Sequence, residues 1–263
     1  MNTSKEVIWI TGASSGIGEA CVYLFNSKGY KVILSARNEK ELTRVKEACS
    51  NPQNAKILPL DLSQTDKATE LVHEAVQLFG KVDILFQNGG ISQRSLVTET
   101  QLEVDRKLME VNFFGTVALT KAILPYFIEN KKGHFGVVTS LVGKFGTPYR
   151  SSYAASKHAL HGFFESLRAE CYEDGILVTM ICPGFIKTQV SVNALTGDGT
   201  ALNQMDDAQA NGMEAKECAE QIFSAIRKQK EEVLIGGKEI FGVYIKRFFP
   251  SLFTKYLKKA KVR

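Results

Sequence analysis

Short apolar segments alternate with longer amphipathic segments along most of the chain. The apolar segments are rich in Val, Ile, Leu and Phe, as expected for buried strands, and lie at residues 7–10, 31–35, 56–60, 83–86, 134–139, 176–181 and 232–235. Helical spacing between them predicts helices over residues 19–25, 38–49, a stretch ending at 79, 102–130 and the region around 153–157. Because strands that alternate with helices pair in parallel, we predict an α/β fold: a doubly wound parallel sheet of about seven strands with helices on both faces.

The composition is typical of one large soluble domain. The 263 residues are 44% hydrophobic and 23% charged, and no repeat or Ser/Gly/Pro-rich linker divides them, so we expect a single domain over residues 1–263. Strand-like sequence begins near Glu6, which leaves no room for a signal peptide, and no apolar stretch reaches the roughly 18 residues that cross a membrane. These features predict a cytoplasmic protein without a spanning helix.

Cysteine and histidine give little evidence of a metal site. Five cysteines are scattered without a Cys-x-x-Cys pair, which indicates reduced core thiols. His158 and His161 lie one helical turn apart with Glu165 further on, so a zinc site is conceivable. Packing on or within a helix is the interpretation that we favour, and we predict no metal.

A glycine-rich turn follows the first apolar segment. Residues 11–18 read Thr-Gly-Ala-Ser-Ser-Gly-Ile-Gly and precede a segment with helical spacing. Glycines let the backbone approach a pyrophosphate, and the N-terminus of the helix offers N–H groups to the anion. The strand–turn–helix context therefore predicts a dinucleotide phosphate site, although the spacing is G-x-x-x-G-x-G and not G-x-G-x-x-G.

Of the eight tyrosines, only Tyr153 has a lysine four residues later, at Lys157. On a helix the two side chains share a face, and a neighbouring cation lowers the pKa of a phenol. Such a tyrosine can donate and accept a proton near neutral pH. Tyr149 is a weaker candidate for this acid, because the residue four positions after it is Tyr153.

Polar residues follow the predicted strands. Gly12, Arg37, Asp61, Asn88, Ser140 and the pair Pro183-Gly184 each come just after an apolar segment. In a parallel sheet these positions meet at one edge, where ligands bind.

These motifs resemble the short-chain dehydrogenase/reductase family over the whole chain. The matching segments are TGASSGIG at 11–18, DL at 61–62, QNGG at 87–90, VNFFG around Asn112, Ser140, YAASK at 153–157 and PGFIKT at 183–188. Residues 34–37 and 88–95 further resemble the branch called dehydrogenase/reductase member 7. One departure is Gln87-Asn88-Gly89-Gly90, where the family usually has Asn-Asn-Ala-Gly, and the extra glycine costs backbone rigidity.

The resemblance implies a Rossmann-type fold and four catalytic residues. It makes Tyr153 the general acid/base, Lys157 the residue that lowers the pKa of Tyr153 and binds the nicotinamide ribose, and Ser140 the donor that steadies the reacting oxygen. It makes Asn112 the residue that kinks its helix and holds a water for proton relay; a helix-surface amide is the alternative. The implied cofactor contacts are Gly12, Ser14, Ser15, Gly16, Ile17, Gly18, Arg37, Asp61, Leu62, Asn88, Gly90, Tyr153, Lys157, Pro183, Gly184, Ile186 and Thr188.

The end of the second apolar segment predicts the cofactor. An acidic residue there binds the ribose 2′-hydroxyl of NAD, whereas an arginine suits a 2′-phosphate. This chain has Ala36 at the acidic position, followed by Arg37, and Ser14 and Asn38 are further candidate donors. We predict NADP(H) in preference to NAD(H); a solvent-facing Arg37 without a ligand is the alternative.

The last 26 residues differ in character from the rest. Residues 238–263 hold eight basic residues and one acid, Glu239, for a net charge of +7, while the whole chain carries +5. Aromatic residues interleave with the cations at helical spacing, as in a helix on an anionic membrane. Packing on the protein, over a greasy pocket or in a homodimer or homotetramer contact, is the alternative that we favour. The aromatics argue against nucleic acid.

Three function classes are compatible with these features. The leading one is an NADP(H)-dependent oxidoreductase acting on a carbonyl or secondary alcohol, with an apolar substrate implied by the branch resemblance. A non-catalytic dinucleotide sensor or scaffold of the same fold is the second, and an epimerase or dehydratase is the third. Residues 190–212, rich in Gly, Asn and Asp, are predicted to form a mobile lid over the substrate.

Overall fold

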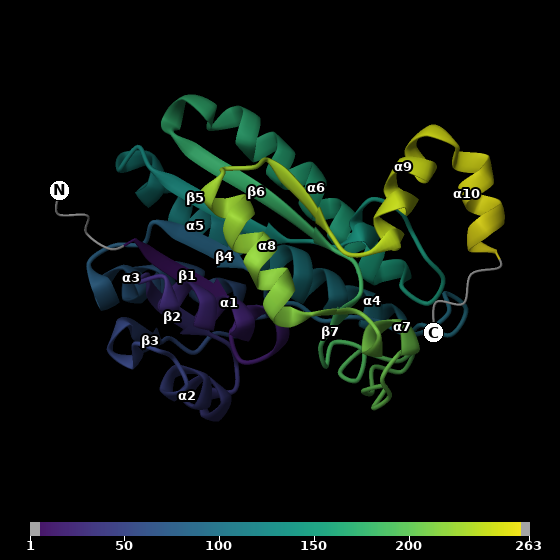
Figure 1. Ribbon diagram of the computed structural model, residues 1–263, viewed down its shortest axis with the longest axis horizontal. Coiled ribbons are helices and arrows are strands. Elements are labelled where there is room, and N and C mark those ends of the chain that lie inside the picture. Colours follow the sequence, from purple (N-terminus) through teal and green to yellow (C-terminus); the bar gives the residue numbers. More distant parts are fainter. Residues whose placement is uncertain (1–5, 259–263) are drawn as a thin grey trace.

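The computed structural model describes residues 6–258, which fold into a seven-stranded sheet with helices on both faces (Figure 1). In spatial order the strands are β3 (Ala55–Ile57), β2 (Lys31–Ser35), β1 (Val7–Thr11), β4 (Ile84–Gln87), β5 (Gly133–Val138), β6 (Ile176–Pro183) and β9 (Glu232–Ile235). All neighbouring pairs are parallel. The strand order reverses between β1 and β4, where such folds form a ligand crevice. The predicted doubly wound parallel sheet is confirmed.

The alternation of side chains along β1 explains the two helical layers. Ile8 and Ile10 face one core, which they share with α1 (Gly16–Ser27), α2 (Glu39–Glu47) and α8 (Ala215–Arg227). Val7 and Trp9 face the other core, which contains α3 (Ala68–Phe79), α5 (Gly115–Glu129) and α6 (Ser151–Glu170). Both faces of a parallel sheet are therefore buried, which is why its strands are apolar throughout.

The remaining elements lie near the carboxyl ends of the strands. They are α4 (Leu102–Met109), α7 (Asp207–Ala210), α9 (Phe241–Phe248), α10 (Pro250–Leu257) and the short parallel pair β7 (Ile186–Lys187) and β8 (Met213–Glu214). The third strand is shorter than predicted and ends at Ile57, and Pro59, which has no N–H, lies at a position that faces away from β2. Single backbone bonds continue on either side of it, from Leu58 N to Leu34 O at 2.9 Å and from Leu60 N to Ala36 O at 3.1 Å.

The predicted long helix at 102–130 is present, with a π turn in its middle. The helical stretch Leu102–Glu129 has the length and apolar content to cross a membrane, and it is the one such helix among residues 6–258. Leu119, Ile123 and Phe127 of this stretch are buried in the core against the sheet. Its packing is that of a core helix, which accounts for its apolar character.

Candidate active site

One large cavity lies beyond the carboxyl ends of the strands. Its volume is about 1640 Å³, and of the predicted site residues all except Gly18 and Asn112 line it. Residues as distant in sequence as Gly12, Arg37, Ser140 and Thr188 are thereby brought to one surface. The strand ends thus meet at this surface, as the sequence predicts, although β6 runs two residues beyond the predicted end at Ile181 and includes Pro183.

The turn between β1 and α1 requires its glycines. Gly12 and Gly16 have φ angles of +65° and +57°, in the left-handed region that disfavours residues with a side chain. A Cβ on Gly18 would lie 2.1 Å from the carbonyl oxygen of Gly12, so the helix can start only with glycine there. Ser15 caps α1 without a side-chain hydrogen bond. The first N–H groups of α1 therefore remain available to an anion in the cavity.

Asn88 connects this turn to the end of β4. Its amide nitrogen donates to the carbonyl oxygens of Thr11 and Gly12, at 3.2 Å each. The hydroxyl of Thr11 accepts from the N–H groups of Asn88 at 3.1 Å and Gly89 at 3.0 Å. These bonds fix the backbone at Gly89, where the family usually has alanine. A Cβ on Gly89 would lie 2.7 Å from Cδ1 of Leu62, so the glycine makes room for that side chain.

The end of β2 offers a cation and no adjacent carboxylate to the cavity. Arg37 is exposed and lines the cavity beside Ala36, and the first acid in sequence is Glu39. Asn38 caps α2 by accepting from Glu41 N at 3.3 Å, so its side-chain oxygen is already used. Burial raises the pKa of Asp61, but hydrogen bonds from Ser63 and the charge of Arg37 outweigh it, and the pKa lies below its usual value.

Tyr153 and Lys157 lie on the first two turns of α6 and face the cavity. The ammonium of Lys157 is 5.8 Å from the centre of the Tyr153 ring and donates to the carbonyl of Val138 at 2.9 Å. Burial raises the pKa of Tyr153, against the lowering effects of a hydrogen bond with Ser140 and of the charges on Arg94 and Arg150. The predicted lowering of this pKa by Lys157 is therefore wrong. Burial instead lowers the pKa of Lys157 to about 8.

Ser140 and Asn112 support the site from two further elements. The Ser140 hydroxyl donates to Pro183 O and accepts from Val142 N, both at 3.3 Å. Asn112 lies in the π turn Glu110–Phe114 and is fully buried, so the surface-amide alternative is wrong. Its amide exchanges two hydrogen bonds with the backbone of Ile91, at 2.8 and 2.9 Å, and donates to Ser156 at 3.1 Å.

Gln93 supports the start of α6, and the sequence argument missed it. The buried side-chain oxygen of Gln93 accepts from the N–H groups of Ser152 at 2.9 Å and Tyr153 at 3.3 Å. It thus acts as a cap supplied from another segment, since Arg150 makes no side-chain cap. The one sequence feature that pointed to Gln93 was its place in residues 88–95, the segment that resembles the member 7 branch.

Two buried arginines share one carboxylate beside Tyr153. Arg94 contacts Asp206 at 2.6 Å and Arg150 contacts the same oxygen at 3.3 Å, and all three side chains are nearly inaccessible to solvent. Asp206 belongs to the predicted lid segment 190–212. Backbone bonds between Arg94 and Leu195 at 2.8 Å, and between Leu195 and Ser92 at 2.9 Å, also hold this segment. Val190, Asn193 and Gln209 of the segment line the cavity, where a lid would stand.

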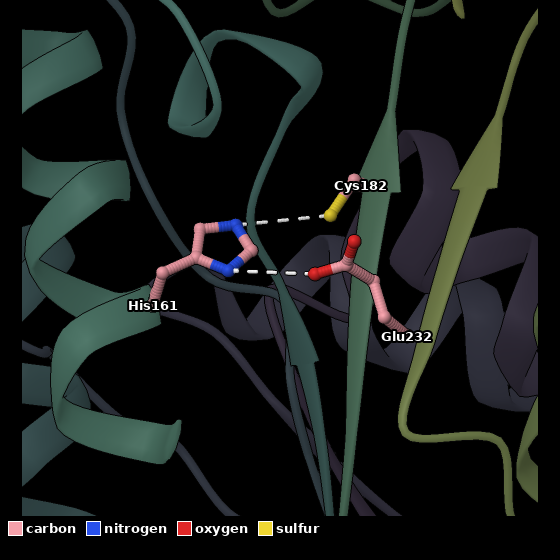
Figure 2. Close-up of side chains that lie close together, drawn as sticks. All are labelled: His161, Cys182 and Glu232. Carbon is pink, nitrogen blue, oxygen red and sulfur yellow. Dashed lines mark hydrogen bonds and ion pairs between the residues drawn. The ribbon is translucent and has the colours of Figure 1, made fainter. Parts of the chain in front are cut away.

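The group His161, Cys182 and Glu232 has metal-ligating side chains close together, within 4.8 Å of one another (Figure 2). The Cys182 sulfur lies 3.7 Å from Nε2 of His161, whereas Glu232 lies 3.8 Å from Nδ1, on the opposite side of the ring. One ion cannot use both nitrogens of an imidazole. Lys144 also pairs with Glu232 at 2.5 Å. The geometry therefore favours a polar core cluster, and His158 bonds Ala154 O instead of joining it.

The C-terminal segment forms α9 and α10 at the rim of the cavity. Its single acid, Glu239, accepts from Phe185 N at 3.2 Å and so attaches the segment to the strand end at Gly184. Phe253 is buried against Phe145, but most other aromatic side chains of the segment are exposed. Phe241, Phe253 and Tyr256 line the cavity, as the prediction of packing over a pocket expects, whereas a contact in a homodimer or homotetramer stays a prediction. Residues 259–263 lie outside the described range.

Comparison with known proteins agrees with the fold. The family model described as short chain dehydrogenase matches residues 6–198. The chain is 43% identical to the rat protein "Dehydrogenase/reductase SDR family member 7B" over 261 residues, covering 96% of this chain and 80% of that protein. It is 40% identical to a Drosophila melanogaster "Dehydrogenase/reductase SDR family protein 7-like", covering 98% of this chain and 81% of that protein. The crystal structure of a short-chain dehydrogenase from Streptomyces avermitilis is similar, with a TM-score of 0.81, 25% identity and 97% coverage of both chains.

Proposed function

The chain belongs to the short-chain dehydrogenase/reductase family, and on that premise we propose that it is an NADP(H)-dependent oxidoreductase of the cytoplasm. It transfers a hydride between the nicotinamide and a carbonyl or secondary alcohol of an apolar substrate. The observation that carries this proposal is the convergence of Ser140, Tyr153 and Lys157 on one cavity with the glycine turn at residues 12–18. A solved structure from Burkholderia phymatum with the same fold, 22% identical and with a TM-score of 0.83, is in complex with NAD.

The residues present fit a dinucleotide. The turn at Gly12, Gly16 and Gly18 is a cradle that a Cβ would fill, and it lies before unsatisfied N–H groups of α1. Arg37, with Ala36 in place of an acid, favours a 2′-phosphate over a free 2′-hydroxyl, which supports NADP(H) over NAD(H). When bound, the cofactor supplies or accepts the hydride.

The protein residues handle the proton. In reduction, the Tyr153 hydroxyl donates a proton to the carbonyl oxygen, and the Ser140 hydroxyl, once turned from Pro183 O, donates a second hydrogen bond to the same oxygen. Burial raises the pKa of Tyr153, so the phenol holds this proton until the carbonyl oxygen takes it. In oxidation Tyr153 must first lose the proton, and the charges of Arg94 and Arg150 favour that loss. A water relay through Asn112 stays a prediction.

Substitution of Tyr153 tests the proposal. Tyr153→Phe removes one oxygen and should lower kcat for carbonyl reduction by about 10²–10⁴-fold, the contribution of general acid catalysis. NADPH binding, followed by fluorescence titration, should change little. Tyr149→Phe is the matched control, since Tyr149 does not line the cavity. A Tyr153→Phe rate within tenfold of the unmodified enzyme excludes Tyr153 as the acid, and binding without turnover on any carbonyl tested favours the sensor alternative.

A further inference from the structure

The last two helices carry most of the exposed apolar surface of residues 6–258. Of the twelve exposed large apolar side chains in this range, seven lie between Phe241 and Tyr256. Phe248 is 70% exposed, Tyr256 66% and Phe249 63%. Figure 1 shows α9 and α10 as a helical hairpin that stands at the edge of the molecule, away from the sheet. Exposed apolar patches of this concentration mark interaction surfaces.

The hairpin is anchored by its inner side chains, so the exposed ones are not needed for its own packing. Phe253 is 3% exposed and meets Phe145 edge to face, with 4.9 Å between ring centres. Val243 and Leu257 pack into the same cluster. The two helices are therefore apolar on two sides, and the outer side, which carries Tyr244, Phe248 and Phe249, has no partner within residues 6–258.

Charge identifies what covers the outer side. The cations Lys246, Arg247 and Lys255 are exposed on the two helices, and Lys238 and Lys258 are exposed just before and just after them. The only acid between residues 238 and 258 is Glu239, and it is turned inward to Phe185 N. The exposed surface of the two helices thus combines aromatic rings with cations alone.

A symmetric contact with a second copy fits this surface poorly. A two-fold contact places the same patch on both subunits, so these cations would face one another and repel. Anionic lipid headgroups instead attract every cation, while aromatic rings prefer the interface between headgroups and acyl chains.

We propose that the outer side of α9 and α10 docks on an anionic bilayer surface. Phe241, Ile245, Leu252 and Tyr256 also line the cavity, so its rim borders the docked face. An apolar substrate then reaches the cavity directly from the lipid. The docking itself does not rest on the proposed enzymatic function, because it depends only on the two helices.

Vesicle co-sedimentation of the full chain tests the docking. Binding is expected to phosphatidylcholine vesicles that contain phosphatidylserine, to be weaker to pure phosphatidylcholine, and to be released by salt. Phe248→Ser should lower the partition coefficient about tenfold, since one buried aromatic side chain contributes about 1.4 kcal/mol or more. Lys246→Glu with Arg247→Glu should lower it further on anionic vesicles only.

Matched controls separate docking from general surface effects. Tyr172→Ser removes an aromatic ring that is 80% exposed elsewhere, and Lys216→Glu with Lys228→Glu reverses two exposed cations, one on α8 and one just after it. These variants should bind vesicles like the unmodified protein, and thermal unfolding should show that all variants fold. No vesicle binding by the intact chain, or equal losses in the controls, overturns the proposal. The proposal is also overturned if the intact chain binds no vesicles and forms a dimer that Phe248→Ser dissociates. Turnover is measured separately, so failure of the proposed enzymatic function leaves this result unaffected.

Discussion

Replacement of Gln93 by methionine should damage both stability and catalysis, because this side chain holds the first turn of α6. Gln93 is fully buried, and its oxygen is the acceptor for the N–H groups of Ser152 and Tyr153. Methionine has nearly the same length and volume but no comparable acceptor. The substitution therefore removes the hydrogen bonds while it keeps the space filled.

The magnitude follows from the number of groups left without a partner. Two N–H donors at the buried start of a helix lose their acceptor, and each costs about 1–3 kcal/mol. The hydroxyls of Ser95 and Thr100, which also contact Gln93, lose less stabilisation because they hydrogen-bond each other at 2.7 Å. We expect the free energy of unfolding to fall by about 2–6 kcal/mol. Because Tyr153 lies in this turn, its displacement should lower kcat by roughly 10- to 100-fold.

Urea unfolding and steady-state kinetics measure the two effects. Gln87→Met is the matched control, since Gln87 is also buried but donates a single hydrogen bond, to Thr120 at 2.7 Å, and its oxygen has no partner. Gln93→Glu keeps an acceptor for α6 and should recover part of the kcat. If Gln93→Met lowers stability and kcat no more than Gln87→Met does, Gln93 does not position Tyr153.

Two further predictions concern the cofactor and pH. Arg37→Ala should raise the KM for NADPH far more than the KM for NADH. Addition of Ala36→Asp should invert the preference between the two cofactors. An unmodified enzyme that uses NADH better than NADPH contradicts the prediction that the end of β2 selects NADPH. Burial lowers the pKa of His134 to about 4 and that of His161 to about 3, so the unfolded chain binds more protons below pH 6.5 and stability falls on acidification. Between pH 7 and 5 the two histidines should together lower the free energy of unfolding by about 3–4 kcal/mol. Urea unfolding of a His134→Gln/His161→Gln variant checks this. If the variant loses as much stability as the unmodified protein, the histidines are not the cause.

The fold and the strand-end part of the cavity lining could be predicted because both follow from local patterns. Apolar segments define parallel strands, and the residues after them meet at one sheet edge, which brings Gly12, Asn88 and Ser140 together. Gln93 could not be found this way. Its contact with α6 joins residues 59 positions apart, and no spacing rule connects a loop glutamine to a distant helix start.

Burial explains the predictions that failed. Four-residue spacing places Lys157 beside Tyr153, but it says nothing about how much water surrounds the phenol, and removal of that water raises the pKa of Tyr153. The same limit applies to α9 and α10. An apolar residue at helical spacing predicts a packed face, yet only the tertiary arrangement shows that Phe253 is packed while Phe248 is exposed.

Glu239 connects the C-terminal hairpin to the proposed chemistry. Its carboxylate accepts from Phe185 N at 3.2 Å and leaves no space for a side chain at Gly184 or Gly236. A shift of the hairpin that moves Glu239 would therefore act on the strand end at Pro183, whose carbonyl accepts the Ser140 hydroxyl. Ser140 in turn hydrogen-bonds Tyr153. A continuous set of contacts thus runs from the surface proposed to meet lipid to the residue proposed to donate the proton, so occupation of that surface should change kcat as well as access of substrate.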